Sequence, residues 1–143
     1  MKGWTTLVAA ETLAVALSRP DVVLVDCRFM LNDPRAGELA WLQGRLPGAA
    51  YAHLERDLSG PAAPGAGRHP LPELKTFLAN LIRWGVTPES QVVAYDAADG
   101  SMAAARFWWL MRLLGHAKVA VLDGGYRRWT TLGLPVDTQV KRL

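Results

Sequence analysis

The sequence predicts an α/β fold in which a central, mainly parallel sheet is covered by helices on both faces. Short apolar runs that are typical of buried strands alternate with segments of helical periodicity, and this alternation implies right-handed crossovers between parallel strands. The run of residues 22–28 is apolar on both faces until Asp26. Such a run is expected of a central strand that helices cover on both sides, which gives three layers.

The composition is that of one globular domain. The chain has 143 residues, of which 50% are hydrophobic and 20% charged, so it can bury a full core and is too apolar for a disordered chain. We expect the domain to span residues 1–136, and residues 137–143 to begin an interdomain linker or a C-terminal tail. No apolar run has the length of a membrane span, so we expect a soluble, cytoplasmic protein without membrane contact.

Charge and residue content exclude several other classes. The formal charge of +3 favours small anionic ligands, but Lys and Arg are scattered and do not form a nucleic-acid-binding face. Cys27 is the single cysteine, which excludes an intrachain disulfide. His53, His69 and His116 lack the spacing of a metal site, so we expect them on the surface or in loops. We therefore expect neither a metal nor a cofactor.

The first two strands flank a short helix. Residues 5–8 have the pattern of a short strand, and residues 10–17 have the apolar spacing of a helix that ends before Pro20. The strand of residues 22–28 follows. Cys27 lies inside it, where a thiol is expected to be buried and unreactive.

A long connection leads to the third strand. Residues 29–46 are mixed in character, with a short helical turn near residues 39–42. A turn at residues 47–48 (Pro-Gly) then precedes a short strand around residues 50–52.

The middle of the chain contains a surface loop and a helix. Residues 59–69 are too rich in Gly, Pro and Ala to pack, so we expect a loop. Pro72 suits the first turn of a helix, which Gly85 ends. We expect its apolar stripe to consist of Leu74, Phe77, Leu78, Leu81 and Ile82.

The last elements are a strand, a glycine turn and a helix. Residues 119–122 form a short buried strand that runs into a sharp turn at residues 123–125 (Asp-Gly-Gly). A final helix is expected over residues 126–132, ended by Gly133.

The stretch of residues 91–115 is the most informative about function. It contains a strand that ends before Asp96, a loop of small and polar residues, and a helical pattern from Met102 onwards. In an open α/β sheet such a junction binds ligands, because loop amides and the helix N-terminus converge there. The loop consists of Asp96, Ala97, Ala98, Asp99, Gly100 and Ser101.

Asp96 holds the first position of this loop, where no Cys, Ser, His or Lys stands. A dehalogenase-type site needs a second carboxylate at the place of Ala98, and a phosphatase-type loop needs cysteine first and arginine at the place of Met102. We therefore expect Asp96 to be a structural carboxylate that accepts hydrogen bonds from loop amides.

Two residue pairs have expected packing roles. Asp26 and Arg28 lie two positions apart, so they share one face of the strand and are expected to connect neighbouring loops by hydrogen bonds. Trp108 and Trp109 point about 100° apart on a helix. One of them should pack on the sheet, and the other should be covered by a terminal helix or by another domain.

Five fragments in order resemble the rhodanese superfamily. They are LVDCR (24–28), GRLPGA (44–49), VVAYD (92–96), AAARFWWLMRLLGH (103–116) and VLDGGYRRWTTLGLP (121–135). Each is weak alone, but their order and spacing make a chance match improbable. The pattern is most similar to the N-terminal domain of the tandem thiosulfate and 3-mercaptopyruvate sulfurtransferases.

The resemblance implies a non-catalytic role for this chain. In catalytic members the residue after the strand is a cysteine that carries a persulfide, and its pKa is lowered by the helix N-terminus. Asp96 stands at that position here, as in the N-terminal domain of the tandem enzymes, and a carboxylate forms no persulfide. The implied partner is a C-terminal rhodanese domain with the active cysteine, and the implied ligands are small sulfur-containing anions. The chain alone is expected to be inactive.

The resemblance also places Phe29, Phe77 and Arg106 at an interdomain cleft, although each aromatic ring equally fits the core. Arg106 is expected to bond Asp96 or loop carbonyls, or else to be a solvated helix charge. A second hypothesis is a stand-alone, non-catalytic rhodanese-like binding module. A third is a catalytic domain that uses Cys27, which requires that strand to be exposed. The sequence leaves open the natural sulfur donor and acceptor and the oligomeric state.

Overall fold

The computed structural model describes residues 3–60, 70–98 and 103–138. Its described strands form one parallel sheet in the order β1-β5-β4-β2-β3. The strands are β1 (Leu7–Val8), β2 (Val22–Asp26), β3 (Ala50–Tyr51), β4 (Gln91–Tyr95) and β5 (Val119–Leu122). The helices are α1 (Ala10–Ala16), α2 (Ala36–Gln43), α3 (Leu74–Arg83), α4 (Ala103–Leu113) and α5 (Gly125–Thr131).

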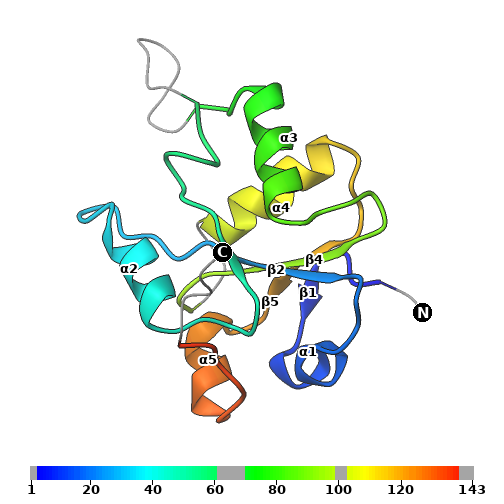
Figure 1. Ribbon diagram of the computed structural model, residues 1–143, viewed down its shortest axis with the longest axis vertical. Coiled ribbons are helices and arrows are strands. Elements are labelled where there is room, and N and C mark those ends of the chain that lie inside the picture. The colour runs from blue at the N-terminus through cyan, green and yellow to red at the C-terminus, as the bar shows by residue number, and fades with distance from the viewer. Residues whose placement is uncertain (1–2, 61–69, 99–102, 139–143) are drawn as a thin grey trace.

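Helices cover both faces of this sheet, so the predicted three-layer fold is confirmed. In Figure 1, α3 and α4 lie above the sheet, and α1 and α5 lie below it. The upper core contains Phe77 and Phe107, and the lower core contains Leu13 and Trp129. The central strand β4 is buried along its whole length, as the apolar pattern on both of its faces requires.

The connection after β2 contains more helix than the sequence indicates. The helix α2 covers eight residues, whereas the pattern predicts only a turn at residues 39–42. Gly37 explains part of the difference, because it brings the helix against the carbonyl of Arg28 and the hydroxyl of Tyr51 with no room for a Cβ. A glycine inside a helix weakens the local signal, while the tertiary contact stabilises the element.

The predicted apolar stripe of α3 is only partly buried. Phe77 and Leu81 are buried, but Leu74, Leu78 and Ile82 are exposed. The helix begins at Leu74, two residues after Pro72. A groove of about 630 Å³ lies between the C-terminal parts of α3 and α4, where Leu78, Ile82 and Met111 are among its lining residues.

Two predicted segments fall partly outside the described residues. Of the loop at 59–69, the structure describes Ser59 and Gly60, and Ser59 is buried with its hydroxyl donating to the carbonyl of Leu54. The backbone of Asp137, the first residue of the expected linker or tail, exchanges two hydrogen bonds with Arg45 (3.0 and 2.8 Å). Residues 139–143 lie outside the described part.

Candidate functional site

The candidate site begins where β4 ends. Asp96 is 7% exposed, and its Oδ1 accepts a hydrogen bond from the amide of Ala98 (3.2 Å). A carboxylate that bonds the amide two residues on forms an Asx-turn, which fixes the start of the loop. Asp96 thus bonds a loop amide as expected. Asp99, Gly100 and Ser101, the rest of the predicted loop, lie outside the described residues.

The first turn of α5 holds this loop from the side. The amide of Tyr126 donates to the carbonyl of Asp96 (2.9 Å), and the amide of Arg127 donates to the carbonyl of Ala97 (2.9 Å). These are N–H groups of a helix N-terminus, which have no partner inside the helix. The turn before α5 therefore fixes the backbone that follows β4.

Gly125 makes the close approach possible. It has a φ of 60°, and a Cβ there would lie 2.7 Å from the Asp96 carbonyl oxygen and 2.8 Å from the Ala98 nitrogen. The sequence predicts a sharp turn at this glycine, but nothing in it indicates the contact with the β4 loop. Two requirements thus select glycine, namely the left-handed backbone and the lack of space.

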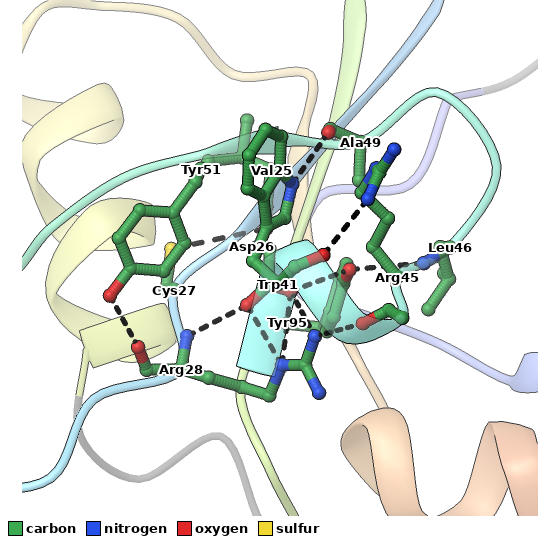
Figure 2. A network of polar contacts seen from close by, with 11 residues as sticks. Val25, Asp26, Cys27, Arg28, Trp41, Arg45, Leu46, Ala49, Tyr51 and Tyr95 are labelled. Carbon is green, nitrogen blue, oxygen red and sulfur yellow. Dashed lines mark hydrogen bonds and ion pairs between the residues drawn. The ribbon is translucent and has the colours of Figure 1, made fainter. Parts of the chain in front are cut away.

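A buried ion pair lies beside the loop (Figure 2). Asp26 is fully buried, and its carboxylate accepts hydrogen bonds from the Arg28 backbone amide (2.9 Å), Nε (3.0 Å) and Nη2 (2.7 Å). The Tyr95 hydroxyl also donates to Asp26 (2.9 Å) and accepts from the amide of Leu46 (3.1 Å). The predicted role of Asp26 and Arg28 in connecting loops is confirmed, and they do it as one bonded unit.

Arg28 extends this network toward α5. Its guanidinium donates to the carbonyl of Gly44 and lies 3.9 Å from the centre of the Tyr126 ring. Tyr126 thus stacks on the ion pair through its ring and holds Asp96 through its amide. Sequence reasoning missed Tyr95 and Tyr126. Both stand beside residues that it singled out, but tyrosine at those places is also typical of an ordinary core.

Burial controls the protonation of this network. It raises the pKa of Asp26, and the hydrogen bonds from Arg28 offset part of that increase. Burial and the neighbouring Asp26 charge raise the pKa of Tyr95 well above its usual value, so the hydroxyl stays protonated and donates. The network is therefore suited to holding geometry rather than to exchanging protons.

Arg106 binds backbone carbonyls, but they belong to the connection of residues 58–70 and not to the Asp96 loop. Its Nε donates to the carbonyl of Leu58 and its Nη2 to that of Pro70, both at 2.8 Å. It thus joins the two described ends of the 58–70 connection rather than the Asp96 loop. The reading of Arg106 as a solvated helix charge is wrong, because the guanidinium is committed to two carbonyls.

His53 is a structural loop residue. Its Nδ1 accepts hydrogen bonds from the amides of Glu55 and Arg56, so Nε2 carries the proton that it donates to the Pro34 carbonyl (2.9 Å). His116 similarly donates from Nε2 to the carbonyl of Ser90 (2.9 Å). In the described ranges no group of His, Cys, Asp and Glu has the arrangement of a metal site. His69 lies outside them.

The aromatic residues assigned to a cleft differ in their positions. Phe77 is buried in the core and meets Phe107 edge to face (6.3 Å between centroids), so it takes the core alternative. Phe29 is half-buried at the end of β2 and meets the His53 ring (5.2 Å). Trp108 packs on the core while Trp109 is exposed, so one of the two packs as expected.

Cys27 is not a catalytic thiol. It has no exposed surface, and burial together with the charges of Asp26, Asp96 and Asp57 raises its pKa well above the ordinary value. A buried thiol with a raised pKa is a poor nucleophile. The hypothesis of a catalytic domain that uses Cys27 is therefore wrong.

Comparison with known proteins identifies the family. The Rhodanese-like domain family matches residues 9–132. A probable 3-mercaptopyruvate sulfurtransferase of Pseudomonas aeruginosa is 46% identical over 130 residues, which are 90% of this chain and 45% of the relative. A putative thiosulfate sulfurtransferase, SseB, of Mycobacterium tuberculosis is 38% identical over 138 residues, which are 96% of this chain and 48% of the relative.

Solved structures agree. The 3-mercaptopyruvate sulfurtransferase of Leishmania major superposes with a TM-score of 0.88 at 26% identity over 97% of this chain and 38% of its own. SseA of Escherichia coli, a 3-mercaptopyruvate sulfurtransferase, superposes with a TM-score of 0.80 at 28% identity, over 98% of this chain and 53% of its own. The chain belongs to the rhodanese family, and it spans about half the length of the curated relatives it matches. Among the described helices, none is long and apolar enough to cross a membrane.

The substitution Gly125→Ala should destabilise the domain more than Gly133→Ala. Both glycines have positive φ, but a Cβ at Gly133 meets no described atom within 4 Å. We expect a cost of about 1 kcal/mol for Gly133→Ala and about 2 kcal/mol more for Gly125→Ala, because the β4 loop must move. Urea unfolding measures both, and equal midpoints would contradict the close packing of Gly125.

The substitution Arg28→Met should cost about 3–5 kcal/mol of unfolding free energy, because it leaves Asp26 buried without its cation. The double variant Asp26→Asn with Arg28→Met should be more stable than Arg28→Met alone. Arg128→Met is the matched control, since its ion pair with Glu11 is exposed and should contribute little. Thermal unfolding compares the variants. If the double variant is no more stable than Arg28→Met, the loss of stability does not come from an uncompensated charge on Asp26.

Cys27 should not react with a thiol reagent in the folded protein at pH 8. Its burial and raised pKa leave little accessible thiolate, so we expect modification at least about 100-fold slower than in urea. The reaction is followed by the absorbance of the thiolate that the reagent releases. Complete reaction corresponds to one group per chain, because Cys27 is the single cysteine. Rapid native labelling would mean that the end of β2 opens readily.

Proposed function

We propose that this chain is the N-terminal, non-catalytic domain of a thiosulfate or 3-mercaptopyruvate sulfurtransferase. The observation that carries the proposal is Asp96 at the end of β4, with its carboxylate bonded to the amide of Ala98. A carboxylate oxygen in the nucleophile position accepts no sulfane sulfur. The coverage of about half of relatives that carry these two names supports a two-domain enzyme.

In the proposed enzyme the reacting thiolate belongs to the other domain. That thiolate attacks the outer sulfur of thiosulfate, a new S–S bond forms, and sulfite leaves with the electron pair of the broken S–S bond. The persulfide then gives its outer sulfur to cyanide or to an acceptor thiolate, and the cysteine thiolate leaves. These reaction steps need no cofactor. We expect the enzyme to act in the cytoplasm.

The role of this chain is then to supply one wall of the cleft. The ion pair of Asp26 and Arg28, the ring of Tyr126 and the turn at Gly125 hold residues 96–98 in one position. A wall held in this way positions a sulfur-containing anion next to the partner's cysteine without reacting with it. The alternative, a stand-alone binding module, shares the fixed residues 96–98 and differs in having no catalytic partner.

Sulfurtransfer by the isolated chain should not exceed the buffer rate. Thiocyanate formation from cyanide is measured with thiosulfate and with 3-mercaptopyruvate as donors, for the parent and for Cys27→Ser. We expect both proteins to give the buffer rate, because Asp96 cannot form a persulfide and Cys27 is buried. The full-length Pseudomonas aeruginosa relative serves as the reference for the assay.

Two outcomes would contradict this expectation. Activity of the parent that disappears in Cys27→Ser would make Cys27 a nucleophile. Activity that persists in that variant and disappears in Asp96→Asn would make Asp96 a reacting group.

A further inference from the structure

Asp137 is bound to residues 45–48 by a set of hydrogen bonds that is here called the clasp. Its backbone exchanges two hydrogen bonds with Arg45 in an antiparallel bridge. Its carboxylate accepts a third from the amide of Gly48 (2.8 Å). The third bond requires a side-chain oxygen at position 137, so the clasp depends on the identity of this residue and not only on the course of the backbone.

The segment that Asp137 binds is itself held in place (Figure 2). Arg45 is 4% exposed, and its guanidinium donates to the carbonyl of Trp41 (2.9 Å) and lies 4.7 Å from the centre of the Trp41 ring. The Trp41 indole in turn donates to the carbonyl of Ala49 (2.9 Å). The clasp therefore joins Asp137 to a fixed part of the domain.

The approach to Asp137 is fixed as well. The side chain of Trp129 on α5 has no exposed surface, and its Nε1 donates to the carbonyl of Pro135 (2.7 Å). The amide of Leu134 donates to the carbonyl of Trp129 (3.2 Å). The chain between α5 and Asp137 is thus bonded at both of its ends.

The antiparallel bridge sets the direction of the chain at Thr138. In an antiparallel pair the residue after Asp137 lies beside the residue before Arg45, so Thr138 lies beside Gly44. The Gly44 carbonyl accepts a hydrogen bond from Arg28, which follows the end of β2. The ends of β2 and β4 are paired with each other. At Thr138 the chain therefore points toward the end of the sheet where β4 ends.

We propose that Asp137 is a positioning residue of the two-domain enzyme. The inference rests on the proposed function, in which the catalytic half follows this domain in the chain. The clasp holds the start of the connecting segment and directs it toward the end of the sheet where β4 ends. A connection with a fixed start samples less space than a free one, so the catalytic cysteine has a higher effective concentration at the Asp96 loop. Asp137 touches no reacting atom and acts only through the direction of the chain.

Hydrogen–deuterium exchange of the isolated chain tests the clasp itself. Asp137→Ala removes the acceptor of the Gly48 amide, so this amide should exchange at least about tenfold faster than in the parent. Asp137→Asn keeps a side-chain oxygen and should retain the parent rate. Thr138→Ala is the matched control, because Thr138 is exposed and adjacent to the clasp. Equal exchange of the Gly48 amide in the parent and in Asp137→Ala would overturn the inference.

The kinetics of a chimera test the positioning. In this chimera the chain replaces the matched 130 residues of the Pseudomonas aeruginosa relative, and thiocyanate formation is measured with 3-mercaptopyruvate as the donor. Asp137→Ala should lower kcat at least about fivefold, because a smaller fraction of molecules has the cysteine at the Asp96 loop. The KM for the donor should change less than about twofold. Asp137→Asn and Thr138→Ala should keep the kcat of the parent.

A longer connection separates positioning from a structural role. A second chimera carries about ten additional Gly and Ser residues after Thr138, so the direction of the chain at the clasp no longer determines where the catalytic half lies. This insertion should itself lower kcat, and Asp137→Ala should then have no further effect. An equal loss of kcat on Asp137→Ala in both chimeras would mean that Asp137 only stabilises the fold, and it would overturn the inference.

Failure of the proposed function gives a different result. A parent chimera without activity would contradict the proposed function, and with it the inference that rests on it. An active parent chimera whose kcat is unchanged by Asp137→Ala would overturn the inference and leave the proposed function standing.

Discussion

The buried ion pair of Asp26 and Arg28 is the interaction on which the geometry of the site depends. It lies at the end of β2, receives the Tyr95 hydroxyl from β4, and reaches the carbonyl of Gly44. Removing two charges from water costs several kcal/mol for each ion. The pair is stable there because backbone and side-chain hydrogen bonds occupy the carboxylate and an aromatic ring covers the guanidinium.

The ion pair also constrains the backbone that follows β4. Tyr126 stacks on Arg28 and donates its amide to the carbonyl of Asp96, so the position of α5 and that of the loop are set together. The chain thus builds the supporting shell that a nucleophile after β4 would need, with a carboxylate in that place.

The sequence is sufficient to predict the fold and the loop after β4, because both depend on local patterns. Apolar runs identify β2 and β4, and the loop after β4 follows from the change of period. Contacts between distant segments carry no such signal. The loops and α3 pack against distant segments, and this packing determines three features that the sequence does not show. These are the hydrogen bonds of Arg106 to carbonyls, the hydrogen bond of His53 to Pro34 and the exposure of Ile82.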